Sequence, residues 1–498
     1  MHSTTLCFLS LPSRPARRLG VACLLVALAA PAWTDTINVP AEQPTIQAAI
    51  DVAVTGDVVL VAPGVYAEEI DFLGKAITVQ SASGPDVTVI DRGALGAQRV
   101  REARRFERHL KRRLERHIRA DGTVEVVDTA SGRRVVEADG RRLEQLRGGN
   151  EGAVVAFDDS ETRLSVLDGF TITGGDADFG GGGIRIESAS PTVINNVIVG
   201  NLACSEGAGI LVAFGSPLIE GNLISDNHQS GCSGGPGGGG ITLRGAASAV
   251  VRGNLIQGNS FGSGGGLSLF AAGTPTIADN RIELNNASSG GGGFDIVNVS
   301  DATIVQNVVT GNTGGAGDGD GFDWLVPSLG IGPYLVANTI SGNGDLEILA
   351  DGFDEDAELV GNIVATGGGG TAIECGDFND TNTPILRFDD VFAQGGTAYG
   401  GICDDPTGTD GNISADPMFT DAAGGDFHLS AGSPSVDAGD NAALELPATD
   451  FDGNARIQDG DGNSTAIVDQ GAFERGAPLP FADGFESGDT SAWDLTVP

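Results

Sequence analysis

The sequence PTVINNVIVGN at residues 191–201 recurs along the chain and decides the fold. Six further copies follow in register: PLIEGNLISDN (217–227), AVVRGNLIQGN (249–259), PTIADNRIELN (275–285), ATIVQNVVTGN (302–312), YLVANTISGN (334–343) and AELVGNIVATG (357–367). The first aligned asparagines stand at positions 196, 222, 254, 280, 307, 338 and 362, so the copies lie 24 to 32 residues apart. Repeats of this length are typical of solenoids, in which each unit forms one coil and stacks on its neighbours.

Each repeat contains short alternating apolar stretches that predict strands. A glycine run precedes an apolar-x-apolar triplet such as Ile184-Arg185-Ile186, and glycine, asparagine and aspartate separate the stretches. No part of the repeat has the 3.6-residue period of a helix. Two or three strands per coil, stacked about 4.8 Å apart, predict parallel sheets in a rod of about eleven coils and roughly 50 Å.

The aligned asparagines predict ladders at the turns of the solenoid. Asparagine tolerates the left-handed turn conformation, and its amide can bond to the asparagine of the next coil. In the first six copies a second asparagine follows five residues after the first, which predicts a second ladder.

Four cysteines in the repeat region have a spacing that matches one coil. The separation is 28 residues from Cys204 to Cys232 and again from Cys375 to Cys403. Metal binding is the alternative, but neither a CxxC pair nor a histidine cluster accompanies these cysteines. Residues on adjacent coils are close enough for a disulfide, so we expect the pairs Cys204–Cys232 and Cys375–Cys403.

The composition excludes several classes of protein. The chain has 498 residues, 78 of them glycine, and a formal net charge of −39. With 40% apolar and 19% charged residues it is neither a disordered acidic tail nor a multi-span membrane protein, and it lacks the strict Gly-x-y period of collagen. The net charge argues against nucleic acid as a partner, because like charges repel.

The N-terminus has the pattern of an export signal. Arg14, Arg17 and Arg18 form a basic region, residues 19–30 are an apolar run, and Ala30-Pro31-Ala32 fits a cleavage site. The apolar run is too short to span a bilayer, so no transmembrane segment is expected in the mature chain. This pattern predicts a protein that is secreted or displayed on the cell surface of a bacterium.

The start of the repeat region resembles a known family. The segment PTIQAAI at residues 44–50 has the pattern of a capped amphipathic helix, and DVVLVAPGVY follows at residues 57–66. This succession resembles the opening of right-handed parallel β-helix proteins of the pectin-lyase-like superfamily, and the likeness extends over residues 36–79 and 155–403. The resemblance implies an all-β fold, a right-handed parallel β-helix solenoid whose N-terminal helix caps the open end.

A second resemblance lies downstream of the repeats. The motifs are DPMF (416–419), GDFHL (425–429), GSPSVDAG (432–439), DFDGN (450–454) and DQGAFE (469–474). They are similar to the choice-of-anchor domain that follows β-helices in bacterial surface proteins, which implies surface display or release without an activity of its own. The segment FADGFESGD (481–489) resembles a short C-terminal tail of exported bacterial proteins.

One segment does not follow the repeat. Residues 99–147 hold 15 basic and nine acidic residues, a local charge of 15 − 9 = +6, against 13 − 58 = −45 for the rest of the chain. A spacing of three and four predicts an amphipathic helix through Val100, Ala103, Phe106, Leu110, Leu114 and Ile118, and residues 123–138 alternate like a hairpin. The helix could lie on the acidic flank of the solenoid. It could also clamp an anionic polysaccharide through Arg104, Arg105, Arg108, Arg112 and Arg116.

These observations give the predicted organisation of the chain. It comprises a signal peptide (1–32), a cap with the first coils (33–95), a basic insert that forms a helix and a hairpin (96–150), β-helix repeats (151–405), a choice-of-anchor-like domain (406–477) and a tail (478–498).

Candidate catalytic residues follow from the strand pattern. The β-helix resemblance implies enzymes that act on uronic-acid polymers: lyases need a cation and a base, and hydrolases need paired carboxylates. In the apolar-x-apolar triplets the middle residue faces outward, so Asp295 and Asp323 would stack on adjacent coils, with Arg244 two coils away. They could form a hydrolase pair, or a calcium site with an arginine base, or they could be an ordinary solvated strand face. The catalytic signatures of the family's lyases, polygalacturonases and epimerases are not evident.

A calcium loop is a further candidate. Oxygen-bearing side chains at alternate positions are typical of such loops, and here they are Asp459, Asp461, Asn463, Thr465 and, further on, Asp469. The loop departs from the EF-hand pattern at Ser464 and Gln470, so a solvated turn is the alternative. Asp318-Gly319-Asp320 is another acidic turn of this kind.

Two function classes remain from the sequence. The first is an exported, monomeric solenoid that binds a polysaccharide or cell-envelope glycan or builds the envelope. The second is a polysaccharide lyase or glycoside hydrolase acting on an acidic polymer.

Overall fold

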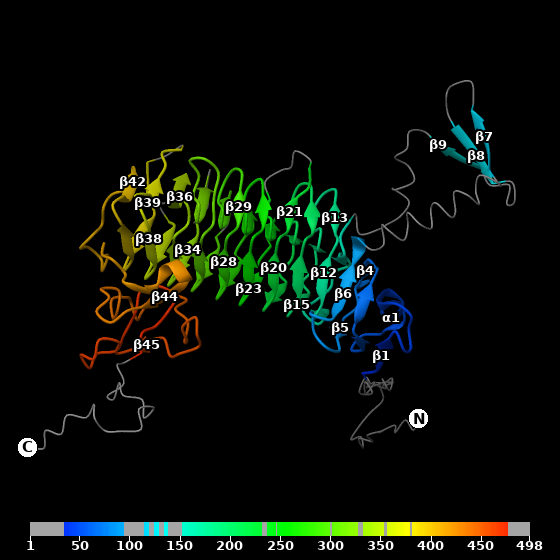
Figure 1. The fold of residues 1–498 in the computed structure, drawn as a ribbon, viewed down its shortest axis with the longest axis horizontal. Coiled ribbons are helices and arrows are strands. Elements are labelled where there is room, and N and C mark those ends of the chain that lie inside the picture. The colour runs from blue at the N-terminus through cyan, green and yellow to red at the C-terminus, as the bar shows by residue number, and fades with distance from the viewer. Residues whose placement is uncertain are drawn as a thin grey trace, which may run out of the picture.

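The computed structural model describes residues 34–93, 114–118, 124–128, 134–137, 152–231, 237–245, 247–298, 301–326, 332–352, 356–378 and 381–476. Over these residues the chain winds into a β-solenoid with three long sheets, which we call sheets A, B and C, of 12, 11 and 11 strands (Figure 1). Each pair of neighbouring strands in these sheets is parallel, for example β14 with β18 and β18 with β22. The predicted all-β parallel solenoid of about eleven coils is therefore confirmed.

The strands of sheet A, in spatial order, are β1 (Thr36–Val39), β2 (Val58–Val61), β5 (Thr78–Ser81), β11 (Val166–Asp168), β15 (Thr192–Ile194), β19 (Leu218–Glu220), β23 (Val250–Arg252), β27 (Thr276–Ala278), β31 (Thr303–Val305), β34 (Tyr334–Val336), β37 (Glu358–Val360) and β40 (Ile385–Arg387).

The strands of sheet B are β3 (Gly64–Tyr66), β6 (Thr88–Asp91), β12 (Thr171–Thr173), β16 (Val197–Val199), β20 (Leu223–Ser225), β24 (Leu255–Gln257), β28 (Arg281–Glu283), β32 (Val308–Thr310), β35 (Thr339–Ser341), β38 (Ile363–Thr366) and β41 (Asp390–Ala393).

The strands of sheet C are β4 (Ile70–Asp71), β10 (Val155–Phe157), β14 (Ile184–Glu187), β18 (Ile210–Ala213), β22 (Ile241–Arg244), β26 (Leu267–Phe270), β30 (Phe294–Val297), β33 (Phe322–Val326), β36 (Leu346–Gly352), β39 (Thr371–Cys375) and β42 (Thr397–Gly401).

A short fourth sheet joins sheets B and C in the middle coils. Its strands are β13 (Asp176–Ala177), β17 (Leu202–Ala203), β21 (His228–Gln229), β25 (Ser260–Phe261) and β29 (Asn286–Ala287). One complete coil thus runs through β14, β15, β16 and β17 before β18 begins the next.

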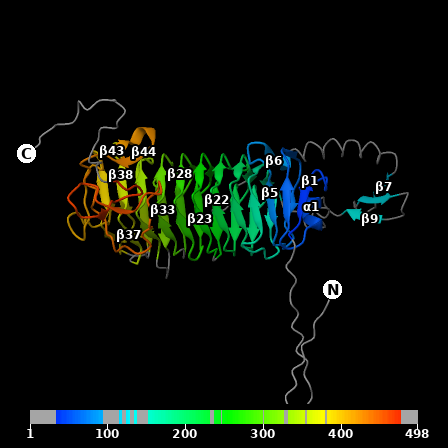
Figure 2. The same cartoon turned by 90° about the horizontal axis from the view of Figure 1, so that it is seen from below.

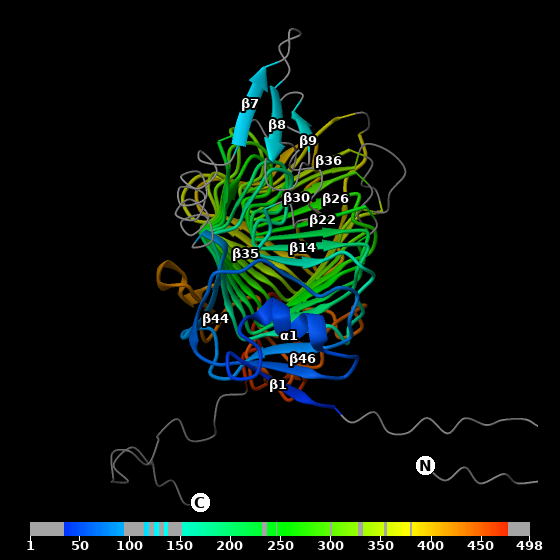
Figure 3. The ribbon, with the colours of Figure 1, turned by 90° about the vertical axis from the view of Figure 1, so that its right-hand side faces the viewer.

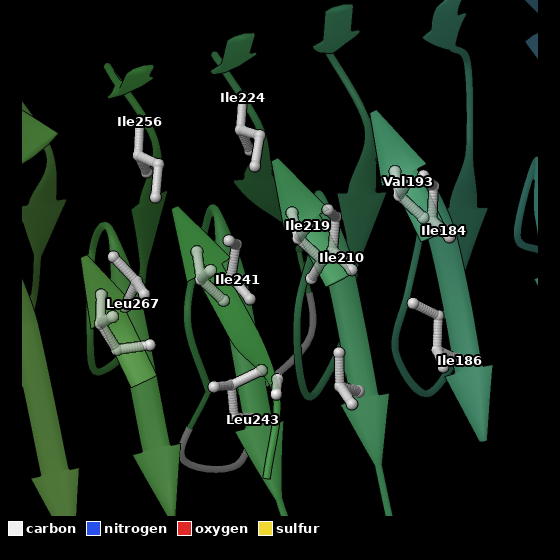
Figure 4. Close-up of a cluster of buried hydrophobic side chains, with 14 of the residues drawn as sticks. Ile184, Ile186, Val193, Ile210, Ile219, Ile224, Ile241, Leu243, Ile256 and Leu267 are labelled. Atoms are coloured by element: carbon white, nitrogen blue, oxygen red, sulfur yellow. The ribbon is translucent and has the colours of Figure 1, made fainter. Parts of the chain in front are cut away.

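Apolar side chains fill the interior of the solenoid in ladders along its axis. Ile184, Ile210, Ile241 and Leu267 occupy equivalent positions on four successive strands of sheet C, and each is 0% exposed (Figure 4). Burial of such a side chain stabilises a fold by about 1.5–3 kcal/mol, so the stacked ladders supply the main favourable term. A strand slipped by one residue would turn this apolar row outward, and the register is therefore well specified.

Both predicted asparagine ladders are present. Each amide donates to the side-chain oxygen of the next coil, for example Asn196 to Asn222 at 3.2 Å and Asn222 to Asn254 at 3.0 Å. The first ladder continues beyond the last predicted copy, because the amide of Asn362 donates to Asp389 at 2.9 Å. The asparagines are buried, so their bonds to backbone groups satisfy turn amides that water cannot reach.

The α-helix α1 (Ile46–Val52) lies at the end of the solenoid at which β1 and β2 are found (Figure 3). Thr45 is its N-cap and accepts a hydrogen bond from the amide of Ala48 at 3.1 Å. The helix contacts β1, β2 and β4. Its role as a cap of the open end stays a prediction.

The basic insert differs in part from its prediction. Residues 114–118 form strand β7 (Leu114–Ile118), antiparallel to β8 (Val124–Asp128), which pairs in turn with β9 (Arg134–Glu137). The predicted hairpin is confirmed, but the predicted helix is wrong at Leu114–Ile118. A spacing of four fits the period of a strand as well as that of a helix, and cross-strand pairing with β8 decides between them. The rest of the predicted helix lies outside the described residues.

One of the two predicted disulfides is confirmed. Cys375 on β39 is bonded to Cys403, just after β42 on the adjacent coil, with a Cα–Cα distance of 5.0 Å. Cys204 also forms a disulfide, and its predicted partner Cys232 lies outside the described residues.

The C-terminal segment, residues 406–476, packs against the outside of the last coils. It contains β43 (Phe419–Asp421), the 3-10 helix η1 (Ala422–Gly424), β44 (Asp426–Leu429), β45 (Ile457–Gln458) and β46 (Ile467–Val468). Phe427 and Phe473 form an apolar cluster with Val308 of sheet B, and Leu429 packs with Ile363. The segment therefore packs against the solenoid, and Figure 2 shows β43 and β44 beside β38.

No helix in the described part of the chain is both long and apolar enough to span a membrane.

Candidate functional site

The structure brings together the two predicted catalytic aspartates. Asp295 on β30 and Asp323 on β33 are direct register partners on adjacent strands of sheet C, as the repeat alignment predicts. Burial, with the nearby Asp318 carboxylate, raises the pKa of Asp295 to about 6. Burial and then the charge of Asp295 raise the pKa of Asp323 to about 7.

Glycine-rich turns cover this row of outward positions. Asp295 is only 5% exposed, and Ser268, its register partner on β26, is 0% exposed. A Cβ on Gly290 would lie 2.6 Å from Oδ1 of Asp295, so the turn can lie this close to the carboxylate only as glycine. Asp295 is thus no ordinary solvated side chain, whereas Asp323 is half-buried, and a polymer reaching Asp295 would have to displace the turn.

The structure does not bring Arg244 to these aspartates. Its register partner on β26 is Phe270, two positions from the Asp295 row. Its Nε lies 3.0 Å from Oε2 of Glu206, and its guanidinium lies 5.1 Å from the centre of the Phe179 ring. Arg244 is therefore occupied by other partners.

The predicted calcium loop gathers three carboxylates. Oxygens of Asp459 and Asp461 converge with one of Asp437, a residue that the sequence analysis did not include, all within 4.8 Å of one another. Both oxygens of Asp437 accept backbone amides of the loop, from Gly460 at 3.1 Å and Asp461 at 2.8 Å. A set of carboxylate oxygens of this kind fits a hard divalent cation such as calcium.

The other three predicted ligands have supporting contacts. Asn463 donates its amide to Asp461 at 2.9 Å, and Thr465 donates its backbone amide to the Asn463 side chain at 2.8 Å. Asp469 is 1% exposed and accepts the backbone amide of Asp437 at 2.7 Å, and burial raises its pKa to about 6. Asp469 thus orients Asp437 through its backbone.

A second group of three carboxylates, which sequence reasoning missed, lies near the N-terminal coils. Oxygens of Asp71, Asp158 and Asp159 lie within 4.8 Å of one another, and Arg185 pairs with Asp158 at 2.6 Å. Among the described residues, Asp295, Asp318 and Asp323 do not form such a group.

Arg116 lies in β7, whereas Arg104, Arg105, Arg108 and Arg112 lie outside the described residues.

A cleft of about 720 Å³ lies between sheet B and the C-terminal segment. Its solenoid wall comes from five adjacent strands, β28, β32, β35, β38 and β41, and its other wall comes from residues 416–427. Four spacings of about 4.8 Å give this wall a length of about 19 Å. The cleft is therefore long enough for a chain molecule.

The lining of the cleft combines aromatic rings with polar groups. Phe392 on β41 and Phe419 on β43 are half-buried, and Phe419 meets Phe427 edge to face with ring centres 5.1 Å apart. Arg281 crosses between the walls: its Nε lies 2.5 Å from Oε2 of Glu283, and its Nη2 donates to the Gly425 carbonyl at 3.2 Å. Rings that offer apolar faces beside fixed hydrogen-bonding groups are typical of ligand sites.

The repeat alignment alone could not have found this cleft. Arg281 and Glu283 occupy repeat positions, but the opposite wall begins at Asp416, more than 130 residues later. The available signal was the set of motifs 416–419 and 425–429, but these motifs resemble a separate domain that follows the solenoid.

One family model agrees with the architecture. The profile of a family described as "Right handed beta helix region" matches residues 153–321. No curated protein sequence matches the chain at a significant level.

Two solved structures are similar to the chain at low identity. One is described as pectate lyase Pel9A, with 13% identity, a TM-score of 0.45, and coverage of 89% of this chain and 96% of the other. The other is described as XylC in complex with xylose, with 12% identity, a TM-score of 0.41, and coverage of 87% and 96%. The family match and the parallel sheets together identify the fold as a right-handed parallel β-helix.

Proposed function

We propose that the protein is an exported solenoid that binds a glycan in the cleft between sheet B and the C-terminal segment. The cleft itself carries this proposal: about 720 Å³ in volume and five strands long, it is lined by half-buried phenylalanines and hydrogen-bonding side chains. A sugar ring offers C–H groups on its faces and hydroxyl groups at its edge. An aromatic ring beside polar groups can contact both.

The C-terminal segment would serve this function as the second wall of the cleft. Its motifs resemble the choice-of-anchor domain, and its side chains are fixed on the solenoid at several points. The Ser435 hydroxyl donates to buried Asp390 at 2.6 Å, and the amide of Ala472 donates to Thr339 at 2.9 Å. We propose that the same segment displays the protein at the cell surface after export by residues 1–32.

Calcium would act as a structural cofactor of that segment. Asp437, Asp459 and Asp461 would hold it through carboxylate oxygens, and Asp469 would orient Asp437. Binding of a cation to the folded loop alone would stabilise the segment by mass action.

The second candidate function is hydrolysis or elimination on an acidic polysaccharide. It is favoured by the register pairing of Asp295 and Asp323 and by the raised pKa of each carboxyl. A group whose pKa lies near neutrality can donate or accept a proton at physiological pH. The turn over Asp295 makes this candidate the weaker of the two.

A glycan array with product detection separates the two functions. Wild type should retain a glycan without turnover, and Phe392→Ala should weaken the binding while Phe378→Ala, a control at a phenylalanine outside the cleft that is 47% exposed, should not. Retention that is equal in Phe392→Ala and wild type would refute the cleft as the site. Released products that disappear in Asp323→Asn would establish the enzymatic alternative.

The basic insert is a separate candidate for binding an anionic polysaccharide. Deletion of residues 99–147 should leave binding in the cleft unchanged if the insert only flanks the solenoid. If the arginines clamp a polyanion, deletion should weaken binding of that polymer, and added salt should weaken it steeply in wild type.

A further inference from the structure

The charged residues in the cleft leave no free positive charge for a ligand. Three lining residues are ionisable, Arg281, Glu283 and Asp416, and their formal charges sum to 1 − 2 = −1. The guanidinium of Arg281 is already held by Glu283 at 2.5 Å and by the carbonyl of Gly425 at 3.2 Å. An acidic sugar in this cleft would therefore bring its carboxylate beside two other carboxylates without a cation to pair with.

Resting on the proposed function, we infer that the glycan bound in the cleft is an uncharged polysaccharide, built of neutral sugars rather than uronic acids or sulfated sugars. Removing a carboxylate from water without a partner of opposite charge is unfavourable, and like charges nearby add to the cost. Because a sugar hydroxyl is an uncharged donor, a neutral sugar can donate hydrogen bonds to these carboxylates without bringing a further negative charge.

The polar groups that remain are of the type that binds neutral sugars. Gln394 is exposed at the rim and carries both a donor and an acceptor, and Thr310 adds a hydroxyl group one strand from Arg281. Thr310 on β32 and Gln394 just after β41 thus place uncharged groups at two points along one wall of the cleft. Uncharged donors and acceptors on several strands can bond to successive sugars of one chain.

Calorimetric titration of the full chain with three hexasaccharides tests the inference. The probes are cellohexaose, mannohexaose and hexagalacturonate, at 150 mM salt. We expect at least one neutral probe to bind, and hexagalacturonate to bind at least roughly tenfold more weakly. Thr310→Val, which replaces the hydroxyl of a half-buried lining residue by a methyl group, should weaken neutral binding about fivefold. Thr397→Val, at an exposed threonine outside the cleft, is the control.

A variant with altered charge tests whether the negative charge of the lining causes the preference for neutral sugars. The double variant Glu283→Gln with Asp416→Asn changes the formal charge of the lining from −1 to +1. It should therefore reduce the difference in affinity between the neutral hexasaccharides and hexagalacturonate. Hexagalacturonate binding that is tighter than neutral binding, and that Phe392→Ala weakens, would overturn the inference while leaving the cleft as a glycan site. Failure of all three probes to bind would instead count against both the proposed function and the inference.

Discussion

Replacement of a single asparagine in the middle of the first ladder should destabilise several coils. Asn254 is 2% exposed, and its Oδ1 accepts the backbone amide of Asn222 at 2.9 Å and the Asn222 side-chain amide at 3.0 Å. Its own amide donates to Ile219 at 3.0 Å, Arg252 at 3.0 Å and Asn280 at 2.9 Å. Asn254→Ala removes all five bonds at once.

The loss of stability in Asn254→Ala follows from the buried backbone groups that lose their hydrogen-bond partners. The buried amide of Asn222 loses its acceptor, and the carbonyl of Ile219 loses a donor. Each buried group left without its bond costs about 1–3 kcal/mol, so the free energy of local unfolding should fall by about 2–6 kcal/mol. The middle of that range corresponds to roughly a thousandfold faster exchange of backbone amides in the affected coils.

Hydrogen exchange followed by mass spectrometry is the suitable assay, because coils of a solenoid can open without global unfolding. Asn286→Ala is the control, since Asn286 is exposed on β29 and should change stability by no more than about 0.5 kcal/mol. Equal exchange in the two variants would refute the view that the asparagine ladders stabilise the turns.

Three further perturbations have defined outcomes. Cys403→Ser, which removes a disulfide between residues 28 apart in sequence, should lower the free energy of unfolding by about 3.5 kcal/mol in the chain-entropy description, as measured by urea denaturation; an unchanged midpoint would contradict this. Burial raises the pKa of Asp389 to about 7 and of Glu474 to about 8, above the value of about 4 in an unfolded chain, so these groups bind more protons in the folded state. Their contribution to stability should be complete below about pH 4 and lost as the pH rises to about 8; Asp389→Asn should raise the urea midpoint at pH 9 and flatten this dependence, and a wild-type midpoint that rises between pH 5 and 9 would contradict the sign. Calcium should raise the Tm of wild type but not of Asp461→Asn, with Asp86→Asn, at an exposed aspartate elsewhere, as the control; equal shifts in the two variants would exclude the loop as the calcium site.

The repeat could be predicted because its determinants are local and periodic. Asn196 and its counterparts stand at the same place in each copy, so their spacing gives the coil length and the positions of the turns. The same alignment placed Asp295 beside Asp323, and the coil length paired Cys375 with Cys403. Asp389 takes the place of the next ladder asparagine, and the substitution concealed one further coil from the alignment.

The features that could not be predicted from the sequence depend on contacts between residues that are distant along the chain. Alternation along sheet C correctly identifies the outward residues, but it carries no information on the glycine-rich turns that cover Asp295. The two walls of the cleft include Arg281 and Gly425, which are 144 residues apart. These residues meet only because the C-terminal segment folds back onto sheet B. The helix predicted through Leu114 was wrong because apolar residues four apart satisfy both periods, and the choice depends on a neighbouring strand.

The most direct measurement of the central claim is a hydrogen-exchange footprint of the bound glycan. The full chain would be compared with and without a saturating concentration of whichever neutral hexasaccharide binds most tightly. Slower exchange should appear in residues 416–427 and in the turns that follow β32, β35 and β38, the two walls of the cleft. The exchange rates of backbone amides in β30 and β33 should not change. Protection confined to β30 and β33 around Asp295 and Asp323 would contradict the account and place the glycan on sheet C.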